Sequence, residues 1–140
     1  MARRGFSLLE LIAVLMIAGI VVALALPRLR NARDAAAVHA AMGELGALYA
    51  AARQEAIARR AAVAVRIDTA GRAVELRVSD ARLVRRALGE TYGVSLGTNR
   101  DSTVYDPRGI GFGLSNVTIV VRRGSVVDTL AVSRLGRVRW

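Results

Sequence analysis

The sequence predicts an α+β fold, a long N-terminal helix packed on antiparallel β-sheets, because its hydrophobic period changes once along the chain. Up to about residue 60, apolar residues recur at spacings of three and four, which is typical of a helix. Beyond residue 62 the period falls to two, which is typical of half-buried strands. The first half of the helix is almost uncharged and long enough to span a membrane.

The apolar run lies between Gly5 and Pro27 and holds 21 residues with a single charge, Glu10. As a helix it would be about 31 Å long, which matches the hydrocarbon core of a bilayer. A carboxylate inside a membrane segment costs about 2.5–3.5 kcal/mol on insertion scales, so such a residue usually has a partner and a function. No small-residue cleavage site follows the run, which argues against a secretory signal peptide and leaves a plain signal anchor as the alternative.

The start of the chain resembles the processing site of type IV pilins and pseudopilins. A short basic leader (residues 1–5) ends at Gly5, Phe6 follows, Glu10 lies five places after the glycine, and Pro27 lies near the far end of the helix. The resemblance implies that a prepilin peptidase removes the leader and that Phe6 becomes the N-methylated first residue. It also implies that Glu10 is the residue on which assembly into a filament depends.

The same resemblance implies that residues 6–27 form a single-pass transmembrane and assembly helix in the inner membrane. Residues 28–140 would then form a pilin-like domain in the periplasm. Charge counting alone leaves this orientation open, because arginines precede the helix and also follow it closely. The expected partners are the inner membrane, the prepilin peptidase and other pilins or pseudopilins in a filament.

Beyond Pro27 the helical spacing continues to about Arg60, so the proline is expected to bend the helix rather than end it. The inward face of this second half is predicted to contain Val38, Met42, Leu45, Tyr49, Ala52 and Ala56. Three pairs of strands are predicted: 63–67 with 74–78 as a first hairpin, 83–88 with 92–96 as a second pair, and 116–122 with 126–132 as a last hairpin. Single strands are predicted at 103–105 and 137–140. A polar loop is predicted at 97–102 and a Gly-rich turn at 109–113.

Three later segments resemble the H-type minor pseudopilins of type II secretion and the FimT-like minor pilins, which form one domain family. They are residues 51–65 with Glu55-Ala56-Ile57, the turn 105–109 (YDPRG), and the ending 131–140 (AVSRLGRVRW). The resemblance implies two antiparallel sheets behind the helix. Residues 79–102 contain none of the family's motifs.

The residues do not predict an enzyme, a cofactor site or a metal site. Cysteine is absent, and the acidic residues are spread over turns and strands without a spacing that pairs them. The single histidine, His39, has no evident partner for catalysis or metal binding. The glycines of 109–113 lack the Lys-Ser/Thr that completes a phosphate-binding loop. The net charge of +10 favours anionic partners such as lipid headgroups, nucleic acid or an acidic neighbouring subunit.

Two functions remain open from the sequence. The first is a minor pseudopilin of a type II secretion system, a non-enzymatic subunit of the periplasmic pseudopilus that drives protein export. The second is a FimT-like type IV minor pilin that binds DNA during natural transformation. The ending Gly136-Arg137-Val138-Arg139 resembles a motif with which some FimT-like pilins contact DNA. Two arginines on one face of a strand could bind successive phosphates, and the indole of Trp140 could stack on a base.

Overall fold

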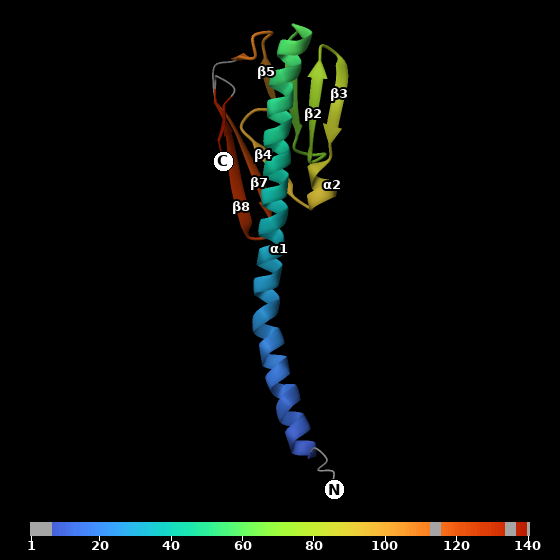
Figure 1. Cartoon of the computed structure of the whole chain (residues 1–140), viewed down its shortest axis with the longest axis vertical. Coiled ribbons are helices and arrows are strands. Elements are labelled where there is room, and N and C mark those ends of the chain that lie inside the picture. The colour runs from blue at the N-terminus through green and yellow to red at the C-terminus, as the bar shows by residue number, and fades with distance from the viewer. Residues whose placement is uncertain (1–6, 113–115, 134–136, 140) are drawn as a thin grey trace. The chain divides into compact units, whose positions relative to one another are not determined.

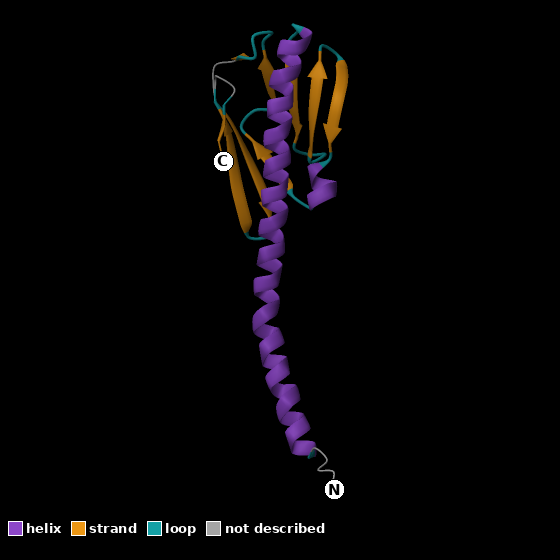
Figure 2. Cartoon of the chain, in the orientation of Figure 1, coloured by secondary structure: helices purple, strands orange, loops and turns teal. Residues whose placement is uncertain are grey.

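The computed structural model describes residues 7–112, 116–133 and 137–139, and the chain forms two compact units, Met1–Arg33 and Asp34–Trp140 (Figure 1). Helix α1 belongs to both units. The second unit adds a short helix and strands that form two sheets (Figure 2). In chain order the elements are α1 (Leu8–Arg59), β1 (Val63–Asp68), β2 (Ala73–Val78), β3 (Ala81–Arg86), α2 (Leu88–Tyr92), β4 (Ser95–Thr98), β5 (Ser102–Tyr105), β6 (Gly111–Phe112), β7 (Val117–Arg123), β8 (Val126–Val132) and β9 (Val138–Arg139).

The predicted long helix is confirmed over all of its described length, and it does not end at Pro27. In the first unit the large apolar side chains are exposed, from Leu8 to Leu29. This stretch makes α1 a helix long and apolar enough to cross a membrane. Its hydrophobic residues have no protein core to enter, so they require lipid or other helices around them.

In the second unit α1 buries one face, and every residue predicted for that face is buried. The buried helix residues are Val38, Ala41, Met42, Leu45, Gly46, Leu48, Tyr49, Ala52 and Ala56. Alanine and glycine at several of these positions allow the strands to approach the helix closely. The helix residues share one hydrophobic core with residues of both sheets.

Two antiparallel sheets complete this core, as predicted. Sheet A has the strand order β3-β2-β1-β5-β6, and sheet B has the order β4-β7-β8-β9. The predicted first and last hairpins are confirmed as β1–β2 and β7–β8. In the first hairpin, Asp68 Oδ1 accepts a hydrogen bond of 2.8 Å from the Gly71 N–H, which closes the turn.

The predicted pairing of 83–88 with 92–96 is wrong. Strand β3 pairs with β2 in sheet A, whereas β4 pairs with β7 in sheet B. The chain passes between the sheets through α2, because Leu88 is fully buried and the Gly89 N–H donates to the Arg72 carbonyl at 2.9 Å. Gly93, with φ of 67°, ends this helix in the left-handed conformation.

The predicted loop at 97–102 is also partly wrong, because β4 continues to Thr98 and β5 begins at Ser102. Hydrogen bonds of the Asn99 side chain explain why the pairing of β4 with β7 extends into the predicted loop. Asn99 Oδ1 accepts from the Thr118 N–H at 2.9 Å, and its Nδ2 donates to the Asn116 carbonyl at 3.3 Å. A polar side chain here continues the pairing of β4 with β7 beyond the strand.

The remaining predicted elements lie near the C-terminus. Ile110 leads into β6, which pairs with β5, so the Gly-rich segment is partly strand over its described residues. The last predicted strand is confirmed only as β9, which pairs Val138 with Val132 and Arg139 with Ala131. Residues 113–115, 134–136 and 140, and therefore the last turn and Trp140, lie outside the described residues.

Two ion pairs fix the sheets to the helix inside the second unit. Arg123 Nε lies 2.9 Å from Asp34 Oδ1, and the same guanidinium donates to the Tyr92 carbonyl. Arg86 Nε lies 3.2 Å from Glu44 Oε1. Because Arg123 ends β7 and Arg86 ends β3, one pair holds each sheet against α1.

Candidate functional site

Glu10 is the third residue of α1, and the local sequence explains why the helix begins there. The Glu10 N–H donates to Ser7 Oγ at 3.2 Å, and the Leu11 N–H donates to the Ser7 carbonyl at 3.1 Å. Ser7 is therefore the N-cap, and Ser7–Glu10 has the spacing of a capping box. A carboxylate in this first turn also interacts favourably with the positive end of the helix dipole.

The Glu10 side chain is exposed among exposed apolar side chains, including Leu9 at 80% and Val14 at 58%. Within the described part of the chain no basic side chain forms an ion pair with it. Gly5 and Phe6, the predicted processing residues, lie outside the described residues. The Glu10 carboxylate therefore lies at the positive end of the helix dipole and has no positively charged partner among the described residues.

The predicted arginines of the C-terminus lie beside a groove of about 590 Å³ in the second unit. Strand β9 contributes Arg137, Val138 and Arg139, and α1 contributes Gly46, Ala50, Arg53 and Gln54. The α1 residues follow the helical spacings of three and four, so they lie on one stripe of the helix. Because Gly46 and Ala50 have small side chains, the groove has space for the longer side chains of the arginines around it.

Backbone pairing with β8 positions the two C-terminal arginines. The Ser133 N–H donates to the Arg137 carbonyl at 2.8 Å, and the Arg137 N–H donates to Ser133 Oγ at 3.1 Å. Val138 turns toward the core, so Arg137 and Arg139 both lie on the opposite face of the strand. The structure thus brings together the two arginines that the sequence places at period two.

Arg53 is the member of this groove that the sequence reasoning missed. It is exposed, and in the described part of the chain Arg53, Arg137 and Arg139 form no ion pair. The feature of the sequence that could have identified Arg53 is its position on the same helical stripe as Gly46 and Ala50. Three guanidinium groups that have no carboxylate partner among the described residues give the groove a capacity for an external anion such as a phosphate or a carboxylate.

Among the described residues, the other candidates raised by the sequence do not come together as a catalytic or metal-binding site. His39 is exposed and lines a separate groove with Ala35 and Val127. Among the described residues no group of three histidine, cysteine or acidic side chains is placed to hold a metal ion. Asp106 instead organises a turn: its Oδ1 accepts from the N–H groups of Arg108 and Ile110, both at 2.9 Å. The Ile110 hydrogen bond is the main cause that lowers the pKa of the Asp106 carboxyl.

Comparison with known proteins agrees with this fold and with the N-terminal pattern. Residues 41–136 match the family described as Type II transport protein GspH, and residues 1–26 match the prokaryotic N-terminal methylation motif. Pilin-like protein PilA1 of Thermus thermophilus is 33% identical over 156 aligned positions, which cover 99% of each chain.

Solved structures with the same fold include the type IV minor pilin FimU of Pseudomonas aeruginosa. In one crystal form the TM-score is 0.63 at 17% identity, over 73% of this chain and 86% of FimU. In a second crystal form the TM-score is 0.60 at 18% identity, over 72% and 90%. At this identity the likeness establishes the fold, a long helix packed on antiparallel sheets, and the match extends over most of both chains.

Proposed function

Because the matched region, residues 41–136, exceeds half of the chain, the protein belongs to the Type II transport protein GspH family of pilin-like subunits, and on that premise we propose that it is a minor pseudopilin of a type II secretion system. In this proposal residues 1–5 are removed after Gly5, and Phe6 becomes the methylated N-terminus. Residues 6–27 hold the subunit in the inner membrane with residues 28–140 in the periplasm. The subunit then enters a pseudopilus that drives protein export, and it catalyses no reaction.

The observation that carries the proposal is the carboxylate of Glu10, which has no ion-pair partner among the described residues and lies in the first turn of a helix whose apolar side chains are exposed. Removal of the leader would create a new amino group at Phe6. In a bundle of such helices, the amino group of one subunit and the Glu10 carboxylate of its neighbour can neutralise each other. Loss of one partner from a charge pair in a dry environment typically costs about 3–5 kcal/mol, so assembly should depend on both groups.

The test compares three variants of the full chain in cells that assemble the filament. Glu10→Gln keeps the size and the capping capacity of the side chain but removes its charge, so it should insert in the membrane and fail to enter filaments. Glu10→Ala should behave in the same way. The matched control is Ser7→Ala, which removes the helix cap, at a cost of about 1 kcal/mol, but leaves the carboxylate.

Normal filament entry by Glu10→Gln would refute the assembly role, and equal failure of Ser7→Ala would assign the effect to helix capping. Intact-mass analysis of protein from membranes tests processing independently. The mature chain should begin at Phe6, and a chain that still begins at Met1 or Ala2 in cells with an active peptidase would contradict the proposal.

A second function, DNA binding by a FimT-like minor pilin, is favoured by one specific observation. Arg53, Arg137 and Arg139 line one groove and have no ion-pair partner among the described residues. Guanidinium groups bind phosphates well, and phosphate contacts carry no sequence information. The expected binding is therefore insensitive to sequence and falls steeply with salt, because each neutralised phosphate releases condensed counterions.

The test measures the salt dependence of DNA binding by residues 34–140. Changing Arg137 and Arg139 to Gln should lower the slope of log affinity against log salt by about 2, and adding Arg53→Gln should lower it by about 1 more. The matched control changes Arg60 and Arg100 to Gln, because both are exposed and neither forms an ion pair with a described residue.

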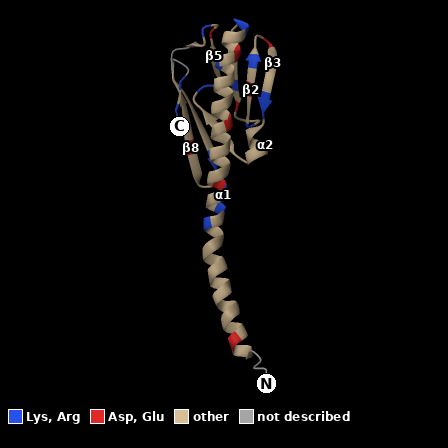
Figure 3. Ribbon diagram, in the orientation of Figure 1, with Lys and Arg blue, Asp and Glu red and all other residues tan. Residues whose placement is uncertain are grey.

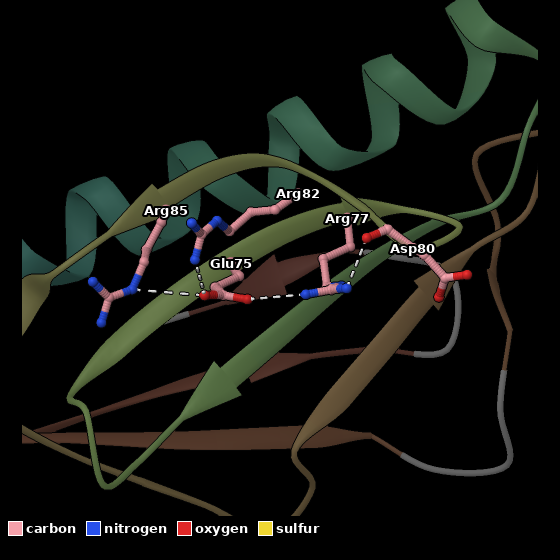
Figure 4. A network of polar contacts seen from close by, with 5 residues as sticks. All are labelled: Glu75, Arg77, Asp80, Arg82 and Arg85. Atoms are coloured by element: carbon pink, nitrogen blue, oxygen red, sulfur yellow. Dashed lines mark hydrogen bonds and ion pairs between the residues drawn. The ribbon is translucent and has the colours of Figure 1, made fainter.

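Arg82 and Arg85 would be a poor control for this experiment, because both pair with Glu75 (Figure 4). Equal loss of binding in the Arg60/Arg100 control and in the groove variants would mean a diffuse basic surface rather than a site. Absence of binding by the unmodified domain near physiological salt would exclude the DNA function and leave the secretion pseudopilin.

A further inference from the structure

On the outer face of sheet A one carboxylate, that of Glu75, lies close to three arginines. Glu75 Oε2 lies 3.5 Å from Arg77 Nη1, and Glu75 Oε1 lies 3.2 Å from Arg82 Nη1 and 3.6 Å from Arg85 Nε (Figure 4). Arg66 on β1 is directly opposite Glu75 in the register. Charged side chains on the outer side and apolar ones on the inner side are typical of an antiparallel sheet with one face in water.

The outer face of sheet B is different. Its outward positions alternate with the buried residues of β7 and β8, and in Figure 3 the ribbon of β8 is largely free of charged residues. The register places Thr118 opposite Ala131, and Val120 opposite Thr129. We define the uncharged face by five outward residues of β7 and β8: Thr118, Val120, Val127, Thr129 and Ala131.

Two arginines lie at the borders of the uncharged face. Arg122 is opposite Val127, and Arg139 is opposite Ala131 across the β8–β9 pair. Both are exposed, and neither forms an ion pair with a described residue. The described outward positions of β7, β8 and β9 include no acidic residue; Asp128 lies on the opposite side, opposite the buried Val121. Unlike the arginines of sheet A that contact Glu75, Arg122 and Arg139 have no carboxylate within ion-pair distance among the described residues, although Asp128 lines the same groove as Val127.

We propose that the uncharged face is the docking surface for the globular domain of a different pilin-like subunit, which presents carboxylates to Arg122 and Arg139. This inference rests on the proposed function as a filament subunit. The exposed methyl groups of Val127 (46% exposed) and Thr129 supply apolar area that association removes from water. The unpaired arginines supply the complementary charge that selects an acidic partner.

Two other occupants fit the surface less well. If two copies of this chain met through this face about a two-fold axis, arginine borders would oppose arginine borders, and like charges in contact oppose association. DNA would need basic or aromatic side chains in the centre of the face, whereas the five defining residues carry only methyl and hydroxyl groups. An acidic protein surface therefore fits this face best.

The absence of cysteine from the chain allows a clean test. In the full-length protein, expressed with the other subunits of its filament, Thr129→Cys is labelled with a maleimide–benzophenone and irradiated. The matched control is Ser102→Cys, an exposed position opposite Arg66 on the outer face of sheet A. We expect Thr129→Cys to give a cross-link to another pilin-like subunit, mapped by peptide mass to its globular domain beside Asp or Glu, and Ser102→Cys to give none.

A second change tests the charge complementarity. Arg122→Glu in the Thr129→Cys chain should lower the cross-link yield by about tenfold or more, since tenfold corresponds to about 1.4 kcal/mol and a charge reversal turns attraction into repulsion. An Asp/Glu→Arg change at the mapped position of the partner should restore the yield.

Three results would overturn the proposal: cross-links only between copies of this chain, equal yields from Thr129→Cys and Ser102→Cys, or no cross-link although the subunit is in filaments. The failure of the proposed function looks different. In that case Glu10→Gln enters filaments normally, or the unmodified chain never enters them, whatever the cross-linking shows.

Discussion

Replacing Tyr105 with Phe should stabilise the protein, although the change removes a polar group from the middle of its core. Tyr105 is fully buried, and its hydroxyl has no hydrogen-bond partner among the described residues. Burial is the main cause that raises the pKa of this hydroxyl to about 12. Its ring packs edge-on against Tyr49, with ring centroids 6.5 Å apart and an interplanar angle of 73°.

The magnitude follows from what the substitution leaves unchanged. Tyr105→Phe keeps the ring and its contact with Tyr49 but removes a hydroxyl whose unsatisfied burial costs about 1–3 kcal/mol. We expect the free energy of unfolding to rise by about 1 kcal/mol, or the melting temperature by about 4 °C for a domain of this size. Tyr49→Phe is the matched control: its hydroxyl lies 3.5 Å from Thr103 Oγ1, so its loss should lower stability by about 0.5 kcal/mol or less.

Urea unfolding of residues 34–140 measures both changes, with an unchanged m-value as the sign that the unfolded state is unaffected. Opposite signs for the two variants would support the reasoning. A Tyr105→Phe variant that is less stable by about 1 kcal/mol or more would refute it, and would mean that an ordered water satisfies the hydroxyl.

Two further changes test the turn that precedes β6. Gly109→Ala should destabilise the domain by about 1–2 kcal/mol in the same urea assay, because Gly109 has φ of 76° and an added Cβ would lie 2.8 Å from Ile57 Cδ1; unchanged stability would show that the turn rearranges at no cost. For Asp106, the lowered pKa means that its stabilising contribution is present above its unfolded pKa, about 3.9, and is lost as the pH falls through the folded value. Asp106→Asn should therefore flatten the fall in stability between about pH 5 and pH 2, and an unchanged pH profile would contradict the assignment.

The sequence predicts most of the fold because hydrophobic spacing records which side of an element is buried. All six positions predicted for the inner face of α1 are buried, and the two clear hairpins form. The predicted pairing fails at β3, whose sequence ARLVRR has arginines at its second, fifth and sixth positions and no regular alternation. Its register with β2 shifts between Leu76 and Arg77, and an edge strand with such an irregularity has no clean period of two.

The candidate sites differ in how far apart their residues lie in the sequence. Ser7, Glu10 and the apolar run that follows them are contiguous, so one stretch of sequence contains the whole pattern. The groove brings Arg53 of α1 beside Arg137 and Arg139 of β9, and no local spacing connects residues so far apart in the chain. The uncharged face likewise depends on the register of β7 with β8, which only the folded chain determines.

Arg139 belongs both to the groove and to the border of the uncharged face, so one guanidinium is available to two different anions. If a neighbouring subunit pairs its carboxylate with Arg139, the groove keeps only Arg53 and Arg137 for a phosphate. A docked subunit and DNA should therefore compete. Arg139→Gln should weaken both interactions, Arg122→Glu should weaken docking more than DNA binding, and Arg53→Gln should weaken DNA binding alone. Cross-link yield and DNA affinity, measured on the same three variants, check this pattern, and parallel losses in all three would mean that overall charge rather than position controls both interactions.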